Sequence, residues 1–213
     1  MLDDTKRGGL DECPSDCEVG DDRRCVAPDP RRAVEPRGFD AGHELTTGQI
    51  TALLEAPRWA PSANNSQPWR FAVTQRGTDA FKAILSSLTP RNQAWAHAAS
   101  ALIVVAAETV KSDGCPSRWA SYDTGQAVAH LTVQAEHEDL AVHQMGGFDR
   151  ERLETLLELP AHVTPLVVVA VGRRGQTSQL PEPFASREDA APERRPLRDL
   201  LIPTESVRAP VAA

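Results

Sequence analysis

A polar loop bounded by two prolines carries a dense set of hydrogen-bonding side chains. It runs from Ala60 to Trp69 as APSANNSQPW, with Pro61 and Pro68 near its ends. Proline fixes the backbone φ angle, so both ends of the loop are expected to be stiff. The hydroxyls and amides between the prolines would then be presented from a rigid backbone, which suits the polar edge of a ring. The alternative is a plain helix-to-strand connection whose Asn and Ser side chains bond its own backbone.

Two adjacent glycines form a second candidate feature, Gly146 and Gly147 in the string QMGGF. Glycine allows a ligand to approach the backbone closely and tolerates a positive φ angle. The N–H groups of such a turn could bond a ligand. The alternative is a simple turn before a helix that Asp149 caps. His143 is the histidine of most interest because it lies beside this turn.

Arginines gather before and after this central region. The two sets are Arg31, Arg32 and Arg37 on one side and Arg194, Arg195 and Arg198 on the other. A guanidinium group forms two parallel hydrogen bonds with phosphate, so the two sets together could hold one. The alternative is a solvated run of surface charge.

Several common catalytic and metal motifs are absent from the sequence. There is no G-x-S-x-G elbow, no phosphate-binding Walker loop, no G-x-G-x-x-G and no H-E-x-x-H. The cysteines, at Cys13, Cys17, Cys25 and Cys115, fit no common zinc spacing. The sequence therefore predicts no metal site.

Composition narrows the class of protein. The chain has 213 residues, a formal net charge of -7 and a pI of about 5.4, which argue for one domain and against a nucleic-acid or membrane-surface binder. No apolar stretch reaches the roughly 18 residues of a membrane span. The first ten residues lack the apolar core of a signal peptide. These features predict a cytoplasmic protein.

The pattern of apolar residues predicts the elements that must position these features. We expect helices over 46–58, 79–88 and 122–139 and after Asp149, with Pro57 ending or kinking the first. Strands are expected over 69–75, 102–107 and 166–172, the last two buried on both faces. Residues 1–30 are too polar to fold and are expected to be a disordered leader, 31–202 form one α+β three-layer domain, and 203–213 form a tail.

In these strings and their order, the sequence resembles the nitroreductase-like family of flavoproteins. The match runs from Leu53 to Phe71 (LLEAPRWAPSANNSQPWRF) and from Tyr122 to Asp149 (YDTGQAVAHLTVQAEHEDLAVHQMGGFD). It closes with LVVVAVGRR and with RRPL at Arg194 to Leu197. The string A-P-S-x-x-N-x-Q-P-W is its most specific part, and the resemblance covers about residues 31 to 202.

The resemblance implies a three-layer α-β-α sandwich with a mostly antiparallel sheet, in an intertwined homodimer. It implies one FMN at each dimer interface, with NAD(P)H as the hydride donor. The proline-bounded loop would lie against the flavin ring, the Gly-Gly turn near flavin N5 and O4, and the arginines at the phosphate. The implied cofactor-binding residues are Arg32, Arg37, Pro61, Ser62, Ala63, Asn65, Gln67, Gly146, Gly147, Arg194 and Arg195. No side chain need act as nucleophile or base, because the flavin carries the chemistry.

Three positions depart from the family's pattern. Ala33 and Glu35 stand where the family's N-terminal phosphate motif has Arg and Ser, and a carboxylate near a phosphate is repulsive. Asp139 replaces a glycine at a helix end, where Asp tolerates the left-handed conformation. Pro57 replaces an alanine close to the loop.

Three functions therefore stand open. The first is a flavin oxidoreductase that passes hydride by a ping-pong mechanism to a small acceptor, such as a nitroaromatic, a quinone, an activated alkene or a natural-product intermediate. The second is a flavin-binding or sequestering protein, or a partner subunit, that has lost catalysis through the altered arginine motif. The third is a hydrolase built on Ser62 or Ser66, which no spacing in the sequence supports.

Overall fold

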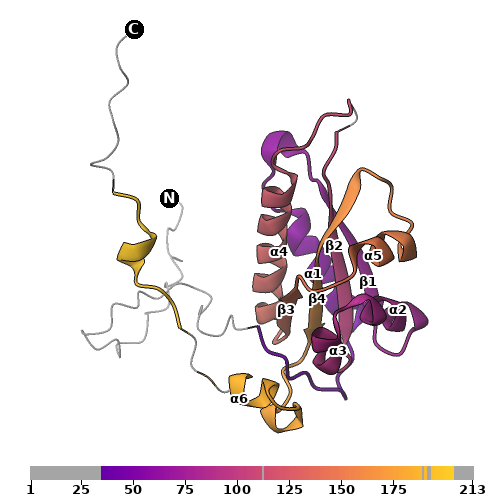
Figure 1. Ribbon diagram of the computed structural model, residues 1–213, viewed down its shortest axis with the longest axis vertical. Helices are drawn as coiled ribbons and strands as arrows, with labels where there is room; N and C mark the ends of the chain where they lie inside the picture. The colour runs from indigo at the N-terminus through magenta and orange to yellow at the C-terminus, as the bar shows by residue number, and fades with distance from the viewer. Residues whose placement is uncertain (1–34, 112, 189, 191–192, 204–213) are drawn as a thin grey trace, which may run out of the picture.

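A four-stranded antiparallel sheet forms the middle of the protein (Figure 1). In this computed structural model, residues 35–111, 113–188, 190 and 193–203 are described. The strands are β1 (Trp69–Gln75), β2 (Ala101–Glu108), β3 (Ala141–Met145) and β4 (Val163–Gly172). Their order is β1-β2-β4-β3, so β1 and β3 are the two edges. The predicted strands over 69–75, 102–107 and 166–172 are confirmed, whereas β3 was not predicted.

Both faces of the two inner strands are covered, which makes the domain three layers thick. On β2, Ile103 and Val105 contact one set of helices, whereas Leu102 and Val104 contact the other. The same alternation runs along β4. Because successive side chains of a strand point to opposite faces, two strands whose central residues are all apolar require helices on both sides. The predicted α+β three-layer sandwich is confirmed.

One layer consists of α1 (Thr47–Arg58) and α4 (Ala120–His137), which pack on each other and on the sheet. Thr46 caps α1 with a capping box, in which its side-chain oxygen accepts the N–H of Gln49 and the Gln49 side-chain oxygen accepts the N–H of Thr46. Pro57 lies in the last turn of α1, which ends one residue later.

The long helix α4 ends as the sequence predicts. Asp139 has a left-handed φ of 53°, and its N–H donates to Glu136 while Leu140 donates back to Ala135. This pair of bonds satisfies the last carbonyls of the helix. The turn sends the chain directly into β3 on the sheet edge.

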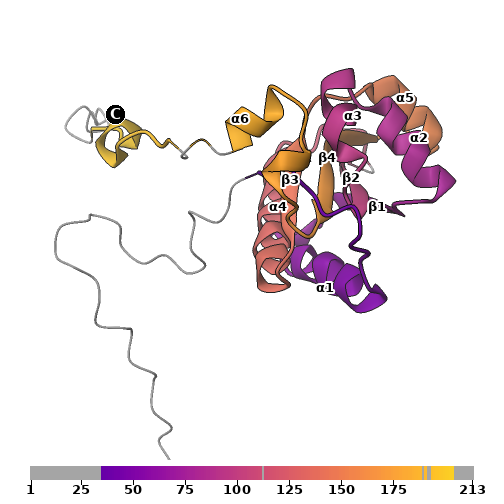
Figure 2. The same ribbon diagram turned by 90° about the horizontal axis from the view of Figure 1, so that it is seen from below.

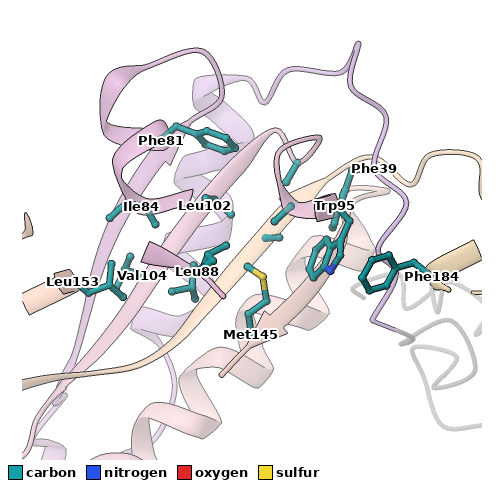
Figure 3. Packing of buried hydrophobic residues seen from close by; sticks show 14 residues of the cluster. Phe39, Phe81, Ile84, Leu88, Trp95, Leu102, Val104, Met145, Leu153 and Phe184 are labelled. Atoms are coloured by element: carbon teal, nitrogen blue, oxygen red, sulfur yellow. The ribbon is translucent and has the colours of Figure 1, made fainter. Parts of the chain in front are cut away.

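The opposite layer contains α2 (Asp79–Ser87), α3 (Pro90–Ala96) and α5 (Arg150–Leu156). Figure 3 shows their buried side chains meeting those of the sheet, with Trp95 beside Phe39 and Phe184. The Asp149 side chain caps α5 as predicted, by accepting the N–H of Arg152. The short helix α3 was not predicted.

The chain leaves the sandwich after β4. It forms two 3-10 turns and one helix, η2 (Thr177–Gln179), α6 (Phe184–Glu188) and η3 (Leu197–Leu200). Phe184 anchors α6 in the core. In Figures 1 and 2, η3 stands apart from the sheet and its helices. No helix among the described residues has the length and apolar character that crossing a membrane requires.

Candidate functional site

The proline-bounded loop is exposed, and part of its bonding capacity is used within the loop itself. The Ser62 hydroxyl oxygen accepts the N–H of Gln67 at 3.0 Å. The Gln67 amide donates to the Asn65 side-chain oxygen at 3.0 Å. These bonds are typical of a plain helix-to-strand connection that bonds its own polar groups. They also restrict the side-chain amides of Asn65 and Gln67. Both residues are exposed, and within the described chain the Asn65 amide nitrogen and the Gln67 amide oxygen make no hydrogen bond.

The loop backbone is strained. Asn64, Asn65 and Gln67 have positive φ angles of 53°, 55° and 46°. Asn tolerates the left-handed region, whereas Gln adopts it rarely and at a steric cost. Three such residues within four positions need outside support, and backbone strain of this kind concentrates at functional sites. One support is visible, because the Ala63 N–H donates to the buried Asp123 carboxylate of α4 at 3.0 Å.

The Gly-Gly turn lies at the end of β3 and rests on the start of α3. The Gly147 carbonyl accepts the backbone N–H of Thr89 at 3.0 Å and the Asn92 side-chain amide at 3.1 Å. A Cβ on Gly147 would lie 3.0 Å from Thr89 Oγ1 and from Asn92 Nδ2, so a side chain there would require one of these groups to shift by a few tenths of an ångström. A Cβ on Gly146 would meet nothing within 4 Å, which leaves space beside the backbone for a ligand.

Neither glycine of the turn uses a positive φ angle, because Gly77 and Gly114 are the described glycines that do. Close approach, rather than a left-handed backbone, is therefore what the turn needs. Asn92 and Thr89 were missed by the sequence reasoning. They lie more than fifty residues before the turn and belong to a helix too short to predict.

The N-terminal segment is tied to β3 by His143. The His143 ring nitrogen Nδ1 lies 2.8 Å from the Glu35 carbonyl oxygen and 3.1 Å from that of Pro36. Both partners are acceptors, so Nδ1 must carry the proton. The Glu35 carboxylate accepts the backbone N–H of Gln144 at 3.3 Å and lies 4.0 Å from His143 Nε2. Glu35 thus lies along the exposed edge of β3.

Arg37 belongs to a segment whose backbone binds an anionic group. Its N–H donates to both carboxylate oxygens of Glu188, at 3.0 and 3.1 Å, and the N–H of Gly38 reaches one of them at 3.4 Å. Two consecutive N–H groups aimed at one carboxylate form an anion-binding nest. No local pattern predicts this contact, because Glu188 lies 151 residues after Arg37 in the chain.

The other predicted phosphate ligands lie far from this nest in one chain. Arg194 and Arg195 are exposed on the segment next to η3, which stands apart from the sheet (Figure 1). Their guanidinium groups donate to nearby backbone carbonyls, of Glu193 and of Asp199. The same segment exposes four large apolar side chains, Leu197, Leu200, Leu201 and Ile202. Arg32 lies outside the described residues.

A single chain does not gather the predicted residues in one place. The Pro61–Gln67 loop precedes edge strand β1 and is held by α4, in one helical layer. The Gly146–Gly147 turn follows the opposite edge strand, β3, and rests on α3 in the other layer. Loop and turn therefore lie at opposite edges of the sheet and against opposite helical layers of one chain.

The exposed aromatic side chains of the described part flank the loop in sequence and in space. Trp59 immediately precedes it, and Trp119 and Tyr122 lie on the first turn of α4, next to the carboxylate that holds Ala63. Trp119 and Tyr122 meet edge to face with ring centroids 6.4 Å apart. Exposed aromatic residues therefore occur next to the loop in sequence and at the start of the helix that holds it, and exposed aromatic rings suit planar ligands.

His143 makes the stability of the domain depend on pH. Burial lowers the pKa of His143, and the positive charge of Arg37 lowers it further, while the Glu35 carboxylate opposes the shift. The unfolded chain, with an ordinary pKa near 6.5, then binds the proton more readily than the folded chain. We expect the free energy of unfolding to be constant above about pH 6.5 and to fall as the pH drops below it.

Urea unfolding at pH 7.5 and pH 5.5 measures this effect. His143→Asn, which can keep a donor near the Nδ1 position without titrating, should reduce the loss of stability on acidification. It should not abolish the loss, because burial and Arg173 also lower the pKa of His43. An unchanged acid sensitivity in His143→Asn would contradict the assignment.

Comparisons with known proteins show what the chain as a whole is similar to. A family model described as "Nitroreductase family" matches residues 30–173. Protein DrgA of Synechocystis sp. is 30% identical over 205 residues, covering 82% of this chain and 93% of that protein. A Bacillus subtilis protein provisionally named NAD(P)H nitroreductase YdgI is 34% identical over 83 residues, 39% of this chain and 38% of that one. A crystal structure described as an oxidoreductase containing FMN shares 31% identity, with a TM-score of 0.80, over 88% of this chain and 94% of that one.

Proposed function

Because the chain belongs to the nitroreductase family, we propose that it is an FMN-dependent oxidoreductase that passes hydride from NAD(P)H to a small acceptor. The single observation that carries the proposal is the rigid exposed loop from Pro61 to Gln67. Its amides are fixed and exposed, its backbone is held in a strained form, and exposed aromatic rings flank it. FMN is also present in the similar crystal structure, which covers most of both chains.

Two copies of the chain form the proposed site. The loop of one copy and the Gly-Gly turn of the other would face each other, since one chain places them in opposite layers. The outer face of α4 favours such contact, because it is exposed and carries small side chains at four-residue spacing, at Ser121, Gly125, Ala129 and Val133. Small residues let two helices approach closely. The apolar segment at η3 would lie against the second copy.

The residues present fit an FMN. The open space beside Gly146 leaves room for a flat ring edge, and the exposed amides of Asn65 and Gln67 match the hydrogen-bonding pattern of a flavin. Flavin supplies the hydride chemistry, which leaves the protein to bind, orient and tune it. Arg37, Arg194 and Arg195, with Arg32, would hold the phosphate by bidentate bonds.

In both half-reactions the chain's own residues would orient the flavin ring and stabilise the charge on it. Fixed amide donors stabilise negative charge on a reduced ring more strongly than mobile water does, because they need not reorganise. The loop and the turn fix the ring while the donor, and then the acceptor, use its open face in turn. The planar ring surfaces of Trp119 and Tyr122 favour aromatic acceptors such as nitroaromatics and quinones. The cytoplasm, where NAD(P)H is available, is the proposed location.

The second candidate, a flavin-binding protein or partner subunit without catalysis, draws support from Glu188. An internal carboxylate fills the anion-binding nest at Arg37 and Gly38, and Glu35 adds a second carboxylate to this region. Glu35, however, is directed to the edge of β3. Its replacement of the family's Ser therefore does not by itself place a charge on the phosphate.

Steady-state kinetics test the proposed mechanism. The initial rate should be measured at several fixed acceptor concentrations, with NADH and with NADPH, using a quinone as the acceptor. The proposal predicts parallel lines in double-reciprocal plots, because donor and acceptor use the same site in succession. Intersecting lines would contradict the ping-pong cycle, and the absence of any turnover with either donor would favour the second candidate.

A further inference from the structure

We propose that Asp123 is a positioning residue that holds the Pro61–Gln67 loop in its flavin-binding form. The inference rests on the proposed function, because the loop matters only if the chain binds flavin there. Asp123 lies in the first turn of α4, and its side chain is 3% exposed. Asp123 is not among the cofactor-binding residues that the resemblance implies.

The contact is a specific one. Asp123 Oδ2 accepts the backbone N–H of Ala63 at 3.0 Å, across 60 residues of sequence. Among the described residues, no Lys, Arg or His forms an ion pair with Asp123. Burying a carboxylate without a cation is costly, so a side chain with this cost is expected to serve a purpose beyond packing.

The loop needs the Asp123 acceptor because Ser62, the residue in the capping position, bonds a different N–H group. Ser62 precedes the 3-10 turn η1 (Ala63–Asn65) but makes no capping bond, since its hydroxyl accepts the N–H of Gln67 instead. The Ala63 N–H would otherwise remain without a partner at the start of the turn. Asp123 therefore acts as the cap of η1 from a distant helix.

The hydrogen bond from Ala63 to Asp123 also stabilises the strained backbone of the residues that follow Ala63. Asn64, Asn65 and Gln67 all have left-handed φ angles, and such a run persists only where the surrounding structure determines it. Removal of the Asp123 acceptor would free Ala63, let the run relax and move the Asn65 and Gln67 amides. The flavin would then lose contacts that depend on fixed positions.

The test uses full-length variants and two readouts on the FMN complex. FMN affinity is measured by fluorescence titration of the apoprotein, and the visible absorption bands report the environment of the bound ring. Asp123→Ala removes the acceptor, whereas Asp123→Asn keeps a side-chain oxygen at the same place without the charge. Thr124→Val is the matched control, because Thr124 is equally buried on the same helix and its hydroxyl has no partner among the described residues.

We expect Asp123→Ala to weaken FMN binding by about tenfold or more and to shift the flavin bands, because the hydrogen bond that fixes the loop is lost. Asp123→Asn should restore affinity to within about threefold, since only the acceptor is required. Thr124→Val should bind FMN as the wild type does. If Asp123→Ala does not fold, Asp123→Glu, which displaces the acceptor by one methylene, should fold and show the same loss.

Two failures are distinguishable. Wild-type protein that binds no FMN would overturn the proposed function, and this inference with it. Wild-type protein that binds FMN, while Asp123→Ala and Asp123→Glu bind it equally well with unchanged flavin bands, would overturn only the role of Asp123. Failure of Asp123→Asn to restore affinity would overturn the capping explanation.

Discussion

Gly125→Trp is expected to convert a dimer into a monomer and to remove FMN from the protein. Gly125 lies on the exposed face of α4, and a Cβ there would meet no atom of its own chain within 4 Å. The large indole should therefore leave the folded monomer intact. It would, however, block the close approach of a second α4 on which the proposed interface depends.

The loss of FMN follows from the loss of the second copy. One chain would keep either the loop or the turn at a given flavin, but not both. Apparent affinity should therefore fall about hundredfold, given roughly 0.5–1.5 kcal/mol for each of the several hydrogen bonds to the ring that are lost. Size-exclusion chromatography with light scattering measures the assembly, and the visible spectrum measures the flavin. Ala80→Trp, an equally large change at an exposed position of α2, is the matched control.

The outcomes for Gly125→Trp separate assembly from binding. A variant that stays dimeric would show that α4 is not the contact. A monomer that binds FMN with wild-type affinity would show that one chain is enough, and would contradict the shared site.

Arg195→Ala is expected to weaken FMN binding by about tenfold to a hundredfold, because each hydrogen bond to a charged phosphate contributes roughly 1.5–3 kcal/mol. Among the described residues, the Arg195 guanidinium bonds the Asp199 backbone carbonyl alone, at 3.3 Å, and Arg195 is exposed. Its removal should therefore leave the free energy of unfolding unchanged. Apoprotein titration with FMN and with riboflavin, which lacks the phosphate, measures the effect.

The comparison of ligands makes the test specific to phosphate. Arg195→Ala should lose affinity for FMN and keep its affinity for riboflavin. Arg198→Ala is the control, since Arg198 lies on the same segment beside Asp199 and is assigned no phosphate contact. Equal FMN affinity in Arg195→Ala and the wild type would end the phosphate assignment.

Elements that carry their own local signals were predictable from sequence. Thr46 and Gln49 form the capping box, Asp149 caps the following helix, and Asp139 adopts the left-handed turn. The inner strands were equally predictable, because runs such as LIVVAA have no polar position and must be covered on both faces. Each of these depends on neighbours within a few residues.

Elements defined by distant partners were not predictable. β3 has five residues, and its pairing with β4 sets its register rather than any pattern of its own. α3 has only seven residues, begins with Pro90 and follows a Thr that makes no side-chain capping bond. Short elements of this kind gain most of their stability from tertiary packing.

The candidate site was predictable only as a set of motifs. The Pro61–Gln67 string and the two glycines stood out by composition, and the structure describes how each is held. Asp123 and Asn92 gave no signal, because a single charged or amide residue on a helix is usually solvated. Their roles appear only when a loop arrives from elsewhere in the chain. No sequence pattern could show that loop and turn lie in opposite layers.

The most direct test of the account is anaerobic reduction of the purified protein. Its visible spectrum is recorded first, after supply of FMN if necessary, and NADPH or NADH is then added without oxygen. The account predicts flavin absorption that bleaches with one of the donors and returns when a quinone is added. Bound flavin that neither donor reduces, or a protein that binds no FMN at all, would contradict it.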